Sequence, residues 1–466
     1  MKKYILLLLS AIAGWGTVTA QPADSDQVTY RKVSKLYRYR VAFADKQDCG
    51  YSIKHPEAFL SAKSIERRKR YGIQVDEHDL PVSTKYLKRL QQMGLKIWNT
   101  SKWNNTVVVE TADTIRMQQV RNLPFVRGVR CVWERPDSIM EWSNFDRRSL
   151  MKNTRDTVAN YYGHGATQVE MLGVEQLHQK GYKGQGVTIA VIDGGFYNAD
   201  LVKGLRQAKV LGTRNFVCAE RSVYEEQSHG MMVLSCIAAN DPHSLVGTAP
   251  EASFYLIQSE DGETEQLIEE DNWCAAVEYA DSLGCDMITS SLGYYQFDHD
   301  YMSHKYYEQD GCTALNSRSA SLMASRGILM LNSAGNASDE PWKKIGFPAD
   351  GRDILAVGAV TDKRRNTNFS SVGNTADGRI KPDVMAMGQA SAVYDIDGTV
   401  TRTNGTSFSC PTMCGAVACL IQAFPRKHPT EIIHALQQSG DNAMHPDNIY
   451  GYGIPNLPKA MKLLAR

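Results

Sequence analysis

The sequence predicts a large α/β domain with a doubly wound parallel sheet, preceded by a small α+β domain. From about Thr167, short β-branched runs alternate with helical stretches, as is typical of parallel sheets covered by helices. The block before it mixes shorter strands and helices without that alternation. The chain has 466 residues, enough for two to four domains of roughly 100–200 residues each.

The N-terminal segment, residues 1–20, is typical of a signal peptide. Lys2 and Lys3 give a positive start, an apolar stretch follows, and Val18-Thr19-Ala20 ends in the small residue that cleavage requires. We therefore expect an exported protein, extracellular or periplasmic after cleavage. No stable membrane span is expected, because no later segment approaches about 20 uninterrupted apolar residues.

Residues 21–135 are predicted to form the small α+β domain, which is long enough to fold alone. Its predicted strands are Lys35–Ala44, two within Leu95–Glu110, and Gly128–Glu134, and its predicted helices are Ala58–Tyr71, Thr84–Met93 and Thr114–Asn122. The first helix is strongly basic at Arg67–Arg70 and either faces the acidic run described below or is solvated. Residues 136–160 are polar and weakly periodic, so a linker or processing region is predicted there.

Residues 161–466 are predicted to form the large domain. Its predicted strands are Val187–Ile192, Ser253–Ile257, Met287–Ser290, Ile328–Asn332 and Ile354–Val357. Met231–Ala239 is predicted to be an apolar helix. A hairpin that turns at Asp397-Gly398 precedes a second apolar helix.

Composition and charge exclude several classes of protein. The net charge of +1, from 52 basic and 51 acidic residues, gives no general attraction to nucleic acid or to an anionic membrane. Zinc-ligand spacing, phosphate loops and dinucleotide fingerprints are absent from the sequence, so no metal and no cofactor are expected. The ten cysteines are scattered, and both disulfides and buried free thiols remain possible for them.

Three segments of the large domain carry reactive side chains. Asp193 ends an apolar strand, His229 opens an apolar helix, and Ser407 lies at the start of another. Together they supply what nucleophilic acyl transfer needs: a hydroxyl, an imidazole to take its proton and a carboxylate to orient the imidazole. The helix start adds backbone N–H groups where an oxyanion would form, and Asn336 adds a side-chain amide at the end of a further strand.

With these residues the sequence resembles the subtilisin-like serine peptidases (subtilases, peptidase family S8). The chain order Asp, His, Ser is the subtilase order, and no G-x-S-x-G elbow surrounds Ser407, which argues against an esterase or lipase. The resemblance extends from about Gln168 to Pro458. It is most specific at Gly405-Thr406-Ser407 with Pro411, and next at Ser333-Ala334-Gly335-Asn336.

The resemblance implies Ser407 as the nucleophile, His229 as general base and then acid, and Asp193 as its orienting partner. Asn336 and the backbone N–H of Ser407 would form the oxyanion hole. The segments that match the family's substrate-binding segments are Ser291, Leu292 and Gly293 with Ser333, Ala334 and Gly335.

The resemblance also has implications around the primary specificity pocket. Gly346 falls where a glycine keeps the pocket floor open, and Phe347-Pro348 where the family has a cis bond. An open apolar pocket would favour a large uncharged side chain just before the scissile bond.

The sequence also departs from the family pattern. Gly194 stands where Ser or Thr is usual, and Phe408 stands where many members have Met. The loop Asn240–Val246 lacks the usual calcium-loop pattern, so calcium is not expected there.

An acidic run from Glu260 to Asp271 leaves two interpretations open. It is either a solvated N-terminus of a helix starting at Asn272, favoured by the helix dipole, or a lining of the substrate cleft at Glu260–Glu265 that selects basic residues upstream of the cleaved bond.

The predicted function is that of an exported serine endopeptidase that cleaves protein or peptide substrates through an acyl-enzyme. Residues 21–135 have the size and texture of a subtilase propeptide, an intramolecular partner that assists folding and inhibits until it is cleaved. The alternative is a secreted binding protein of the subtilase fold without turnover. A third possibility is a processing enzyme that acts chiefly on its own N-terminal block.

Overall fold

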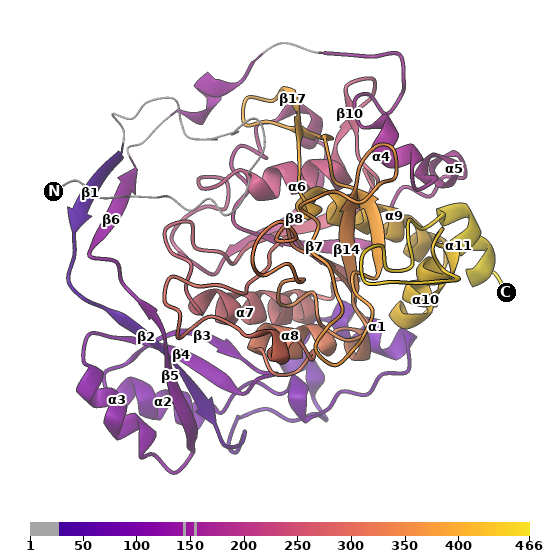
Figure 1. The fold of residues 1–466 in the computed structure, drawn as a ribbon. Helices are drawn as coiled ribbons and strands as arrows, with labels where there is room; N and C mark the ends of the chain where they lie inside the picture. The colour runs from indigo at the N-terminus through magenta and orange to yellow at the C-terminus, as the bar shows by residue number, and fades with distance from the viewer. Residues whose placement is uncertain (1–27, 143–145, 153–155) are drawn as a thin grey trace.

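The computed structural model describes residues 28–142, 146–152 and 156–466 (Figure 1). The predicted signal peptide lies outside the described residues. The chain forms two units that pack together, with the N-terminal unit lying against the large α/β domain beside α7 (Ile268–Leu283) and α8 (Leu315–Ser321). The predicted fold class is confirmed.

The large domain is built on a seven-stranded sheet in which every pair of neighbouring strands is parallel. The strand order is β15-β14-β13-β12-β7-β11-β8. The strands are β7 (Thr188–Asp193), β8 (Lys209–Asn215), β11 (Ser253–Gln258), β12 (Met287–Ser290), β13 (Leu329–Ser333), β14 (Leu355–Val360) and β15 (Val384–Met387). All residues of β7, β13 and β14 are buried, which explains why these strands have almost continuous apolar sequences.

Helices cover both faces of this sheet (Figure 1). Along β7, Ile189 and Val191 join one hydrophobic cluster, while Ala190 and Ile192 join the other. The first cluster includes residues of α5 (Val174–Gln179), α6 (His229–Ala238), α9 (Thr406–Ala423), α10 (Pro429–Ser439) and α11 (Leu457–Leu464). The second includes residues of α7 and α8, so the sheet is doubly wound.

The N-terminal domain is a four-stranded antiparallel sheet with two of its helices on one face. The strand order is β3-β4-β2-β5. The elements are β2 (Tyr37–Phe43), α1 (Ala62–Arg70), α2 (Thr84–Gln92), β3 (Lys96–Ser101), β4 (Thr106–Thr111), α3 (Thr114–Arg121) and β5 (Val126–Glu134). Val41, Val107 and Val109 pack with α2 and α3, whereas Val108 and Val132 point into the cluster shared with α7.

A two-stranded ribbon extends this domain. The strand β1 (Val28–Lys32) pairs antiparallel with β6 (Ser138–Trp142). Residues 138–142 of the predicted linker are therefore a strand, and the predicted linker residues 143–145 and 153–155 lie outside the described part of the chain.

The basic helix α1 makes the most buried ion pairs between the two domains. Arg67 and Arg68 are each 1% exposed and both pair with Asp281 near the end of α7, which is fully buried. Arg68 also pairs with Asp79 at 2.7 Å. Of the two interpretations of this helix, solvation is wrong for Arg67 and Arg68, and their partner lies beyond the acidic run.

The acidic run is also largely buried. Helix α7 begins at Ile268, and Glu269, Glu270 and Asp271 in its first turn are at most 2% exposed. A solvated helix N-terminus is therefore wrong for these residues, because the N-terminal domain and the loop before α7 cover them.

Two further features of the large domain bear on sequence-based expectations. The ten cysteines are free thiols in the described structure, and Cys410, Cys414 and Cys419 are buried along α9. Helix α9 has the length and apolar composition of a membrane span, but 89% of it is buried inside the protein, as in the core helix of a globular domain.

Candidate active site

Asp193 and His229 meet at the carboxyl edge of the parallel sheet. Asp193 is the last residue of β7, and His229 is the first residue of α6. The imidazole Nδ1 lies 2.7 Å from Oδ1 of Asp193, and the same oxygen accepts the Gly194 N–H at 2.8 Å. Asp193 is fully buried, whereas a third of the His229 side chain is exposed.

Close packing around Gly230 makes this contact possible. A Cβ at Gly230 would lie 2.5 Å from the Gly195 carbonyl oxygen and 2.9 Å from the Asp193 Cβ. Because a larger residue cannot fit there, glycine lets the first turn of α6 approach the end of β7. The Gly230 N–H donates to the Gly195 carbonyl at 2.8 Å and fixes that approach.

Electrostatics favour the charged form of His229. Burial by itself lowers the pKa of His229, but the charge of Asp193 and the hydrogen bond to it outweigh burial. The carboxylate of Glu260 acts in the same direction, so the pKa of His229 is held above its ordinary value. The imidazole is therefore a stronger base than a free histidine.

Ser407 lies in the first turn of α9, directly after Gly405 and Thr406. Gly405 has φ of 151°, within the range that favours glycine. The Ser407 hydroxyl donates to the Ser291 carbonyl at 3.3 Å, and the Ser291 hydroxyl donates back to the Ser407 carbonyl at 3.0 Å.

The Ser407 hydroxyl and the His229 imidazole come from neighbouring helix starts. Within the described residues no hydrogen bond joins them, while the ring of Phe408, next to Ser407, lies 5.8 Å from the His229 ring between centroids. The structure thus brings Asp193 and His229 into contact and leaves the Ser407 hydroxyl on another acceptor, an arrangement usual before substrate binds.

Thr406 orients the amide of Asn336. The Asn336 Oδ1 accepts hydrogen bonds from the N–H and the hydroxyl of Thr406, both at 2.9 Å. The Thr406 hydroxyl in turn accepts from the Gly335 N–H at 3.2 Å. Because the oxygen of the amide is engaged, its Nδ2 remains to serve as a donor beside the start of α9. The sequence pointed to Thr406 only as a family match, and its role as an orienting residue comes from the contacts.

The two predicted substrate-binding segments lie next to each other. Ser291, Leu292 and Gly293 follow β12, and Ser333, Ala334 and Gly335 end β13 and follow it. The strands β12 and β13 are parallel neighbours, and Gly346 donates its N–H to the Ala334 carbonyl at 3.0 Å. A Cβ at Gly346 would lie 3.3 Å from the Gly293 Cα, so this glycine allows the segments to approach. The Phe347-Pro348 bond is cis.

The unusual Gly194 makes room for a side chain in front of the Asp193–His229 pair. A Cβ at Gly194 would lie 2.4 Å from Oε1 of Gln227 and 3.3 Å from Oε2 of Glu260. Gly262 flanks the other side of Gln227, since a Cβ there would lie 2.2 Å from its Nε2. The Gln227 side chain therefore occupies space that Ser or Thr at position 194 would take.

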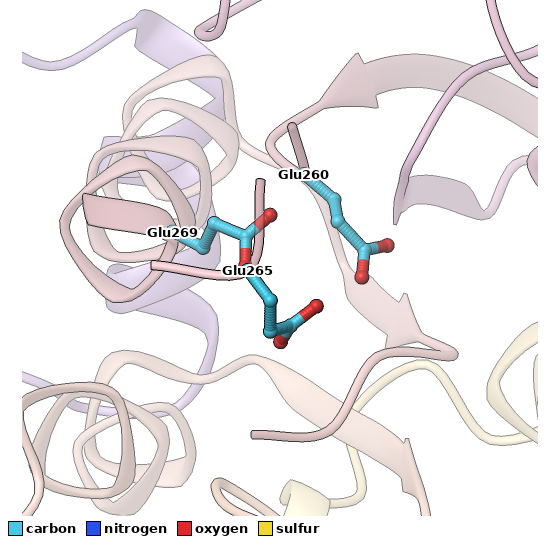
Figure 2. A group of neighbouring side chains, drawn as sticks. All are labelled: Glu260, Glu265 and Glu269. Atoms are coloured by element: carbon cyan, nitrogen blue, oxygen red, sulfur yellow. The ribbon is translucent and has the colours of Figure 1, made fainter. Parts of the chain in front are cut away.

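Glu260 also lies close to Asp193 and His229, which the sequence did not reveal. Burial, followed by the charge of Asp193, raises the pKa of Glu260 to about 7. The sequence included Glu260 in the acidic run, but the packing beside it involves Gly194 and Gln227, which are distant in the sequence. Among the described residues, the group of His, Cys, Asp and Glu side chains with a geometry that could hold a metal ion is Glu260, Glu265 and Glu269 (Figure 2).

The fold and the site define a serine peptidase built on an α/β sheet of the subtilisin type, and comparison with known proteins gives the family. Residues 184–453 match the subtilase family, and residues 38–147 match the peptidase S8 propeptide domain of Bacteroidota. The chain therefore belongs to the subtilase family.

Curated relatives and solved structures agree with this assignment. The chain is 31% identical to subtilisin of Bacillus pumilus, covering 64% of this chain and 98% of that protein. It is 28% identical to subtilisin DY of Bacillus licheniformis, covering 63% of this chain and 97% of that protein. Two solved structures share the fold at a TM-score of 0.50: the prenylagaramide maturation protease PagA, 20% identical over 63% of this chain and 98% of that one, and MycP1 with its N-terminal propeptide removed, 22% identical over 63% and 96%.

The protein is a serine endopeptidase with an intramolecular propeptide domain. The alternative, a binding protein without turnover, is not favoured.

Proposed function

We propose that Asp193, His229 and Ser407 are the catalytic triad of this peptidase. The proposal rests chiefly on the buried 2.7 Å contact between Asp193 and His229, beside the helix start that carries Ser407. Because a carboxylate only accepts hydrogen bonds, Nδ1 of His229 carries the proton and Nε2 keeps a free lone pair. That lone pair takes the Ser407 proton as the Oγ attacks the peptide carbonyl.

The negative charge that develops on the carbonyl oxygen requires donors. We assign these to Asn336 Nδ2 and the Ser407 N–H, which is among the free N–H groups at the start of α9. When the C–N bond breaks, His229 returns the proton to the leaving amine. Water then attacks the carbonyl carbon of the acyl-enzyme while His229 takes its proton. The bond to the Ser407 oxygen breaks, His229 returns the proton to that oxygen, and the acid product leaves.

We propose that the substrate strand lies between the two segments beside Gly346. These are Ser291, Leu292 and Gly293 on one side and Ser333, Ala334 and Gly335 on the other. The proximity of Gly346 to Gly293 supports this assignment, since neither residue has a side chain to fill the space. Protein or peptide segments are the expected substrates.

The chain is proposed to be an exported precursor with a signal peptide at residues 1–20, a propeptide domain at 21–135, a processing region at 136–160 and the peptidase at 161–466. The match to a propeptide domain and the buried ion pairs of α1 with α7 support the inhibitory role of the N-terminal domain. Export to the extracellular space or periplasm is supported by the charge and apolar pattern of the first 20 residues.

Covalent labelling by a fluorophosphonate tests the triad directly. Purified protein and its Ser407→Ala variant, which is processed in trans by the active protein, are compared before and after processing, with N-terminal sequencing of each product. Label on the processed protein that is absent from the variant supports the assignment. Equal label in both would show that another residue is the nucleophile. An active protein that still begins near residue 21 would contradict the inhibitory role of the propeptide.

A further inference from the structure

Arg147 joins the segment after the N-terminal domain to the large domain. Its guanidinium makes two parallel contacts with the carboxylate of Asp200, from Nη1 at 2.8 Å and from Nη2 at 3.0 Å. Nη1 also donates to the Tyr224 carbonyl at 3.0 Å and to Oδ1 of Asn198 at 3.3 Å. The guanidinium carbon lies 5.9 Å from the centre of the Tyr197 ring. The guanidinium is therefore held by acceptors from two separate loops.

These two loops carry the residues of the catalytic pair. One loop follows Asp193, at the end of β7, and contains Asn198 and Asp200. The other loop contains Tyr224 and leads into His229, at the start of α6. Because a single guanidinium binds both loops, it ties the chain after the carboxylate to the chain before the imidazole.

Backbone hydrogen bonds join the same loops along a line that begins at the pair. The Gly230 N–H donates to the Gly195 carbonyl at 2.8 Å, beside the pair. Farther along the loops, the Asn198 N–H donates to the Tyr224 carbonyl at 3.4 Å, which is long for such a bond. Arg147 binds the Tyr224 carbonyl and the Asn198 side chain, so it reinforces the contact between the loops where their own bond is long.

The same segment contacts the hairpin that precedes Ser407. Residues 146–152 (the arm) end at Lys152, whose Nζ lies 2.6 Å from Oδ2 of Asp397. The Lys152 N–H also donates to the Asp397 carbonyl at 2.8 Å. Asp397 lies at the turn of the hairpin of residues 391–403, which is followed by the helix start that carries Ser407. The arm therefore contacts chain segments next to each of the three proposed catalytic residues.

The contacts of the arm place it with the peptidase rather than with the propeptide domain. Upstream of the arm, β6 still pairs with β1 of the N-terminal domain. In the described part of the chain, the side-chain hydrogen bonds and ion pairs of Arg147 and Lys152 are all with the large domain. Arg147 is the last residue of the match to the propeptide domain, yet its side chain is bound by the peptidase.

The geometry of the Arg147 contacts is of the kind that gives a partly exposed ion pair real influence. The side chains of Arg147 and Asp200 are 23% and 33% exposed. Most ion pairs with such exposure contribute little, but bidentate pairs of arginine with a carboxylate are the exception, because the planar guanidinium is held in one orientation. Asn198, the third partner, is fully buried and gives the guanidinium a fixed acceptor.

We propose that Arg147 is a positioning residue, which holds the loops next to Asp193 and His229 in the arrangement that aligns this pair and which stays with the peptidase after maturation. The inference rests on the proposed function. It implies that the cut that releases the propeptide domain falls before Arg147, within the region that the sequence marked only as a linker or processing region. Arg147 acts through the pair, so its loss should slow the chemical step and leave substrate binding intact.

The expected loss is partial, because the loop before His229 has a second attachment. The Nε2 of Gln258 donates to Oε2 of Glu226 in that loop at 3.1 Å. We therefore expect a fall in kcat of about tenfold, less than the roughly hundredfold that a misplacement of 1 Å can cause.

The test measures kcat and KM of the matured full chain on a neutral fluorogenic peptide, with active sites titrated to completion by a fluorophosphonate. Arg147→Ala and Asp200→Asn should each lower kcat about tenfold without a change in KM. The double variant should be no worse than either single variant, because both changes remove the same interaction. Arg147→Lys keeps the charge but not the two parallel contacts, so its kcat should lie between those of Arg147→Ala and the wild type.

Chemical rescue separates positioning from a general loss of stability. Guanidinium chloride, far below denaturing concentrations, should restore part of the kcat of Arg147→Ala. It should restore none in Asp200→Asn, which lacks the carboxylate that binds the ion, and sodium chloride at equal concentration should restore none in either variant. Asp200 lies outside the processing region, so Asp200→Asn carries the test even where Arg147→Ala is not processed.

Arg148→Ala is the matched control. Arg148 is exposed, and among the described residues the ion pairs of the arm belong to Arg147 and Lys152. The same substitution one residue along the chain should therefore leave kcat, KM and the thermal midpoint unchanged.

N-terminal sequencing of the mature wild-type protein should find a first residue at or before Arg147. A fully active mature protein that begins after Arg147 would overturn the inference. So would wild-type kcat in both Arg147→Ala and Asp200→Asn, or a lowered thermal midpoint in both without any loss of kcat. In each of these cases Ser407 would still react with a fluorophosphonate. Absence of both labelling and cleavage in the wild type would contradict the proposed function itself.

Discussion

The Nδ1 atom of His229 lies 2.7 Å from Oδ1 of Asp193, and the carboxylate that it meets is fully buried at the end of a central strand. The opposite carboxylate oxygen, Oδ2, has no hydrogen-bond partner among the described residues. The interaction of Asp193 with the imidazole is therefore concentrated on one oxygen and one tautomer. A substitution of Asp193 that breaks this single hydrogen bond should therefore lower the catalytic rate.

Asp193→Asn should preserve the fold and lower kcat by about 10⁴-fold. The amide presents an N–H to the imidazole, so His229 would turn its lone pair to Nδ1 and its proton to Nε2, the atom that must accept the Ser407 proton. Steady-state cleavage of a neutral peptide measures the effect. Circular dichroism of the variant controls for folding, and a loss of less than tenfold would show that Asp193 does not set the tautomer.

The acid limb of the pH profile should report His229 and its neighbour Glu260. The base must be neutral, so kcat/KM rises with pH through the pKa of His229, which lies above the ordinary value of 6.5. Glu260→Gln removes a negative charge that favours the imidazolium, and the pKa of His229 should fall. The limb therefore moves to lower pH.

The matched control for that shift is Glu251→Gln. Glu251 lies just before β11, at the end of the strand remote from the site, so its substitution should leave the pH profile unchanged. A limb that stays fixed in Glu260→Gln, or that moves to higher pH, would show that Glu260 does not act on the imidazole.

The strands that position the site could be predicted because burial makes their sequences apolar. Four of the strands in the large sheet, β7, β12, β13 and β14, lie wholly in the core and were all predicted from such runs. The edge strand β8 was missed because all its residues but the last are exposed or half-buried, which allows polar side chains. The edge strand β15 was also missed, since its sequence Val-Met-Ala-Met contains a single β-branched residue.

The glutamates show what a linear pattern does not contain. The sequence placed the acidic run from Glu260 to Asp271 before a helix that starts at Asn272, yet α7 starts at Ile268 and buries the last three acids of that run. Their burial depends on Arg40 and His304, which come from other elements and neutralise two of the acids. Such long-range pairing cannot be deduced from local charge, whereas the order of Asp193, His229 and Ser407 can be recognised from the residues beside them.

Asn336→Ala should lower kcat by about 10²–10³-fold with little change in KM, because the amide acts on charge that forms only in the transition state. Thr406→Val tests the orientation of that amide, since it removes the hydroxyl that donates to Asn336 Oδ1 at 2.9 Å and keeps the side-chain shape. A smaller loss in kcat, again without a change in KM, is expected. Equal losses in kcat and gains in KM would instead indicate that Thr406 shapes the substrate site.

The ion pairs between the domains give a prediction about the precursor. Asp281 is fully buried and is approached by Arg67, Arg68 and Lys102, and although burial raises its pKa, these three charges hold that pKa well below its usual range. Asp281→Asn would leave the arginines buried without their main counter-charge, which costs about 3–5 kcal/mol. The cost falls on the precursor, because the arginines are in the propeptide domain and become solvated once that domain leaves.

We therefore expect Asp281→Asn, in a Ser407→Ala background that keeps the chain whole, to lower the urea midpoint of the precursor. The control is Asp362→Asn, at an exposed turn of the large domain that also contains Asp281, and it should leave the urea midpoint unchanged. Hydrogen exchange in α1 should rise in the first variant alone, and unchanged protection there would show that these pairs do not hold the propeptide domain in place.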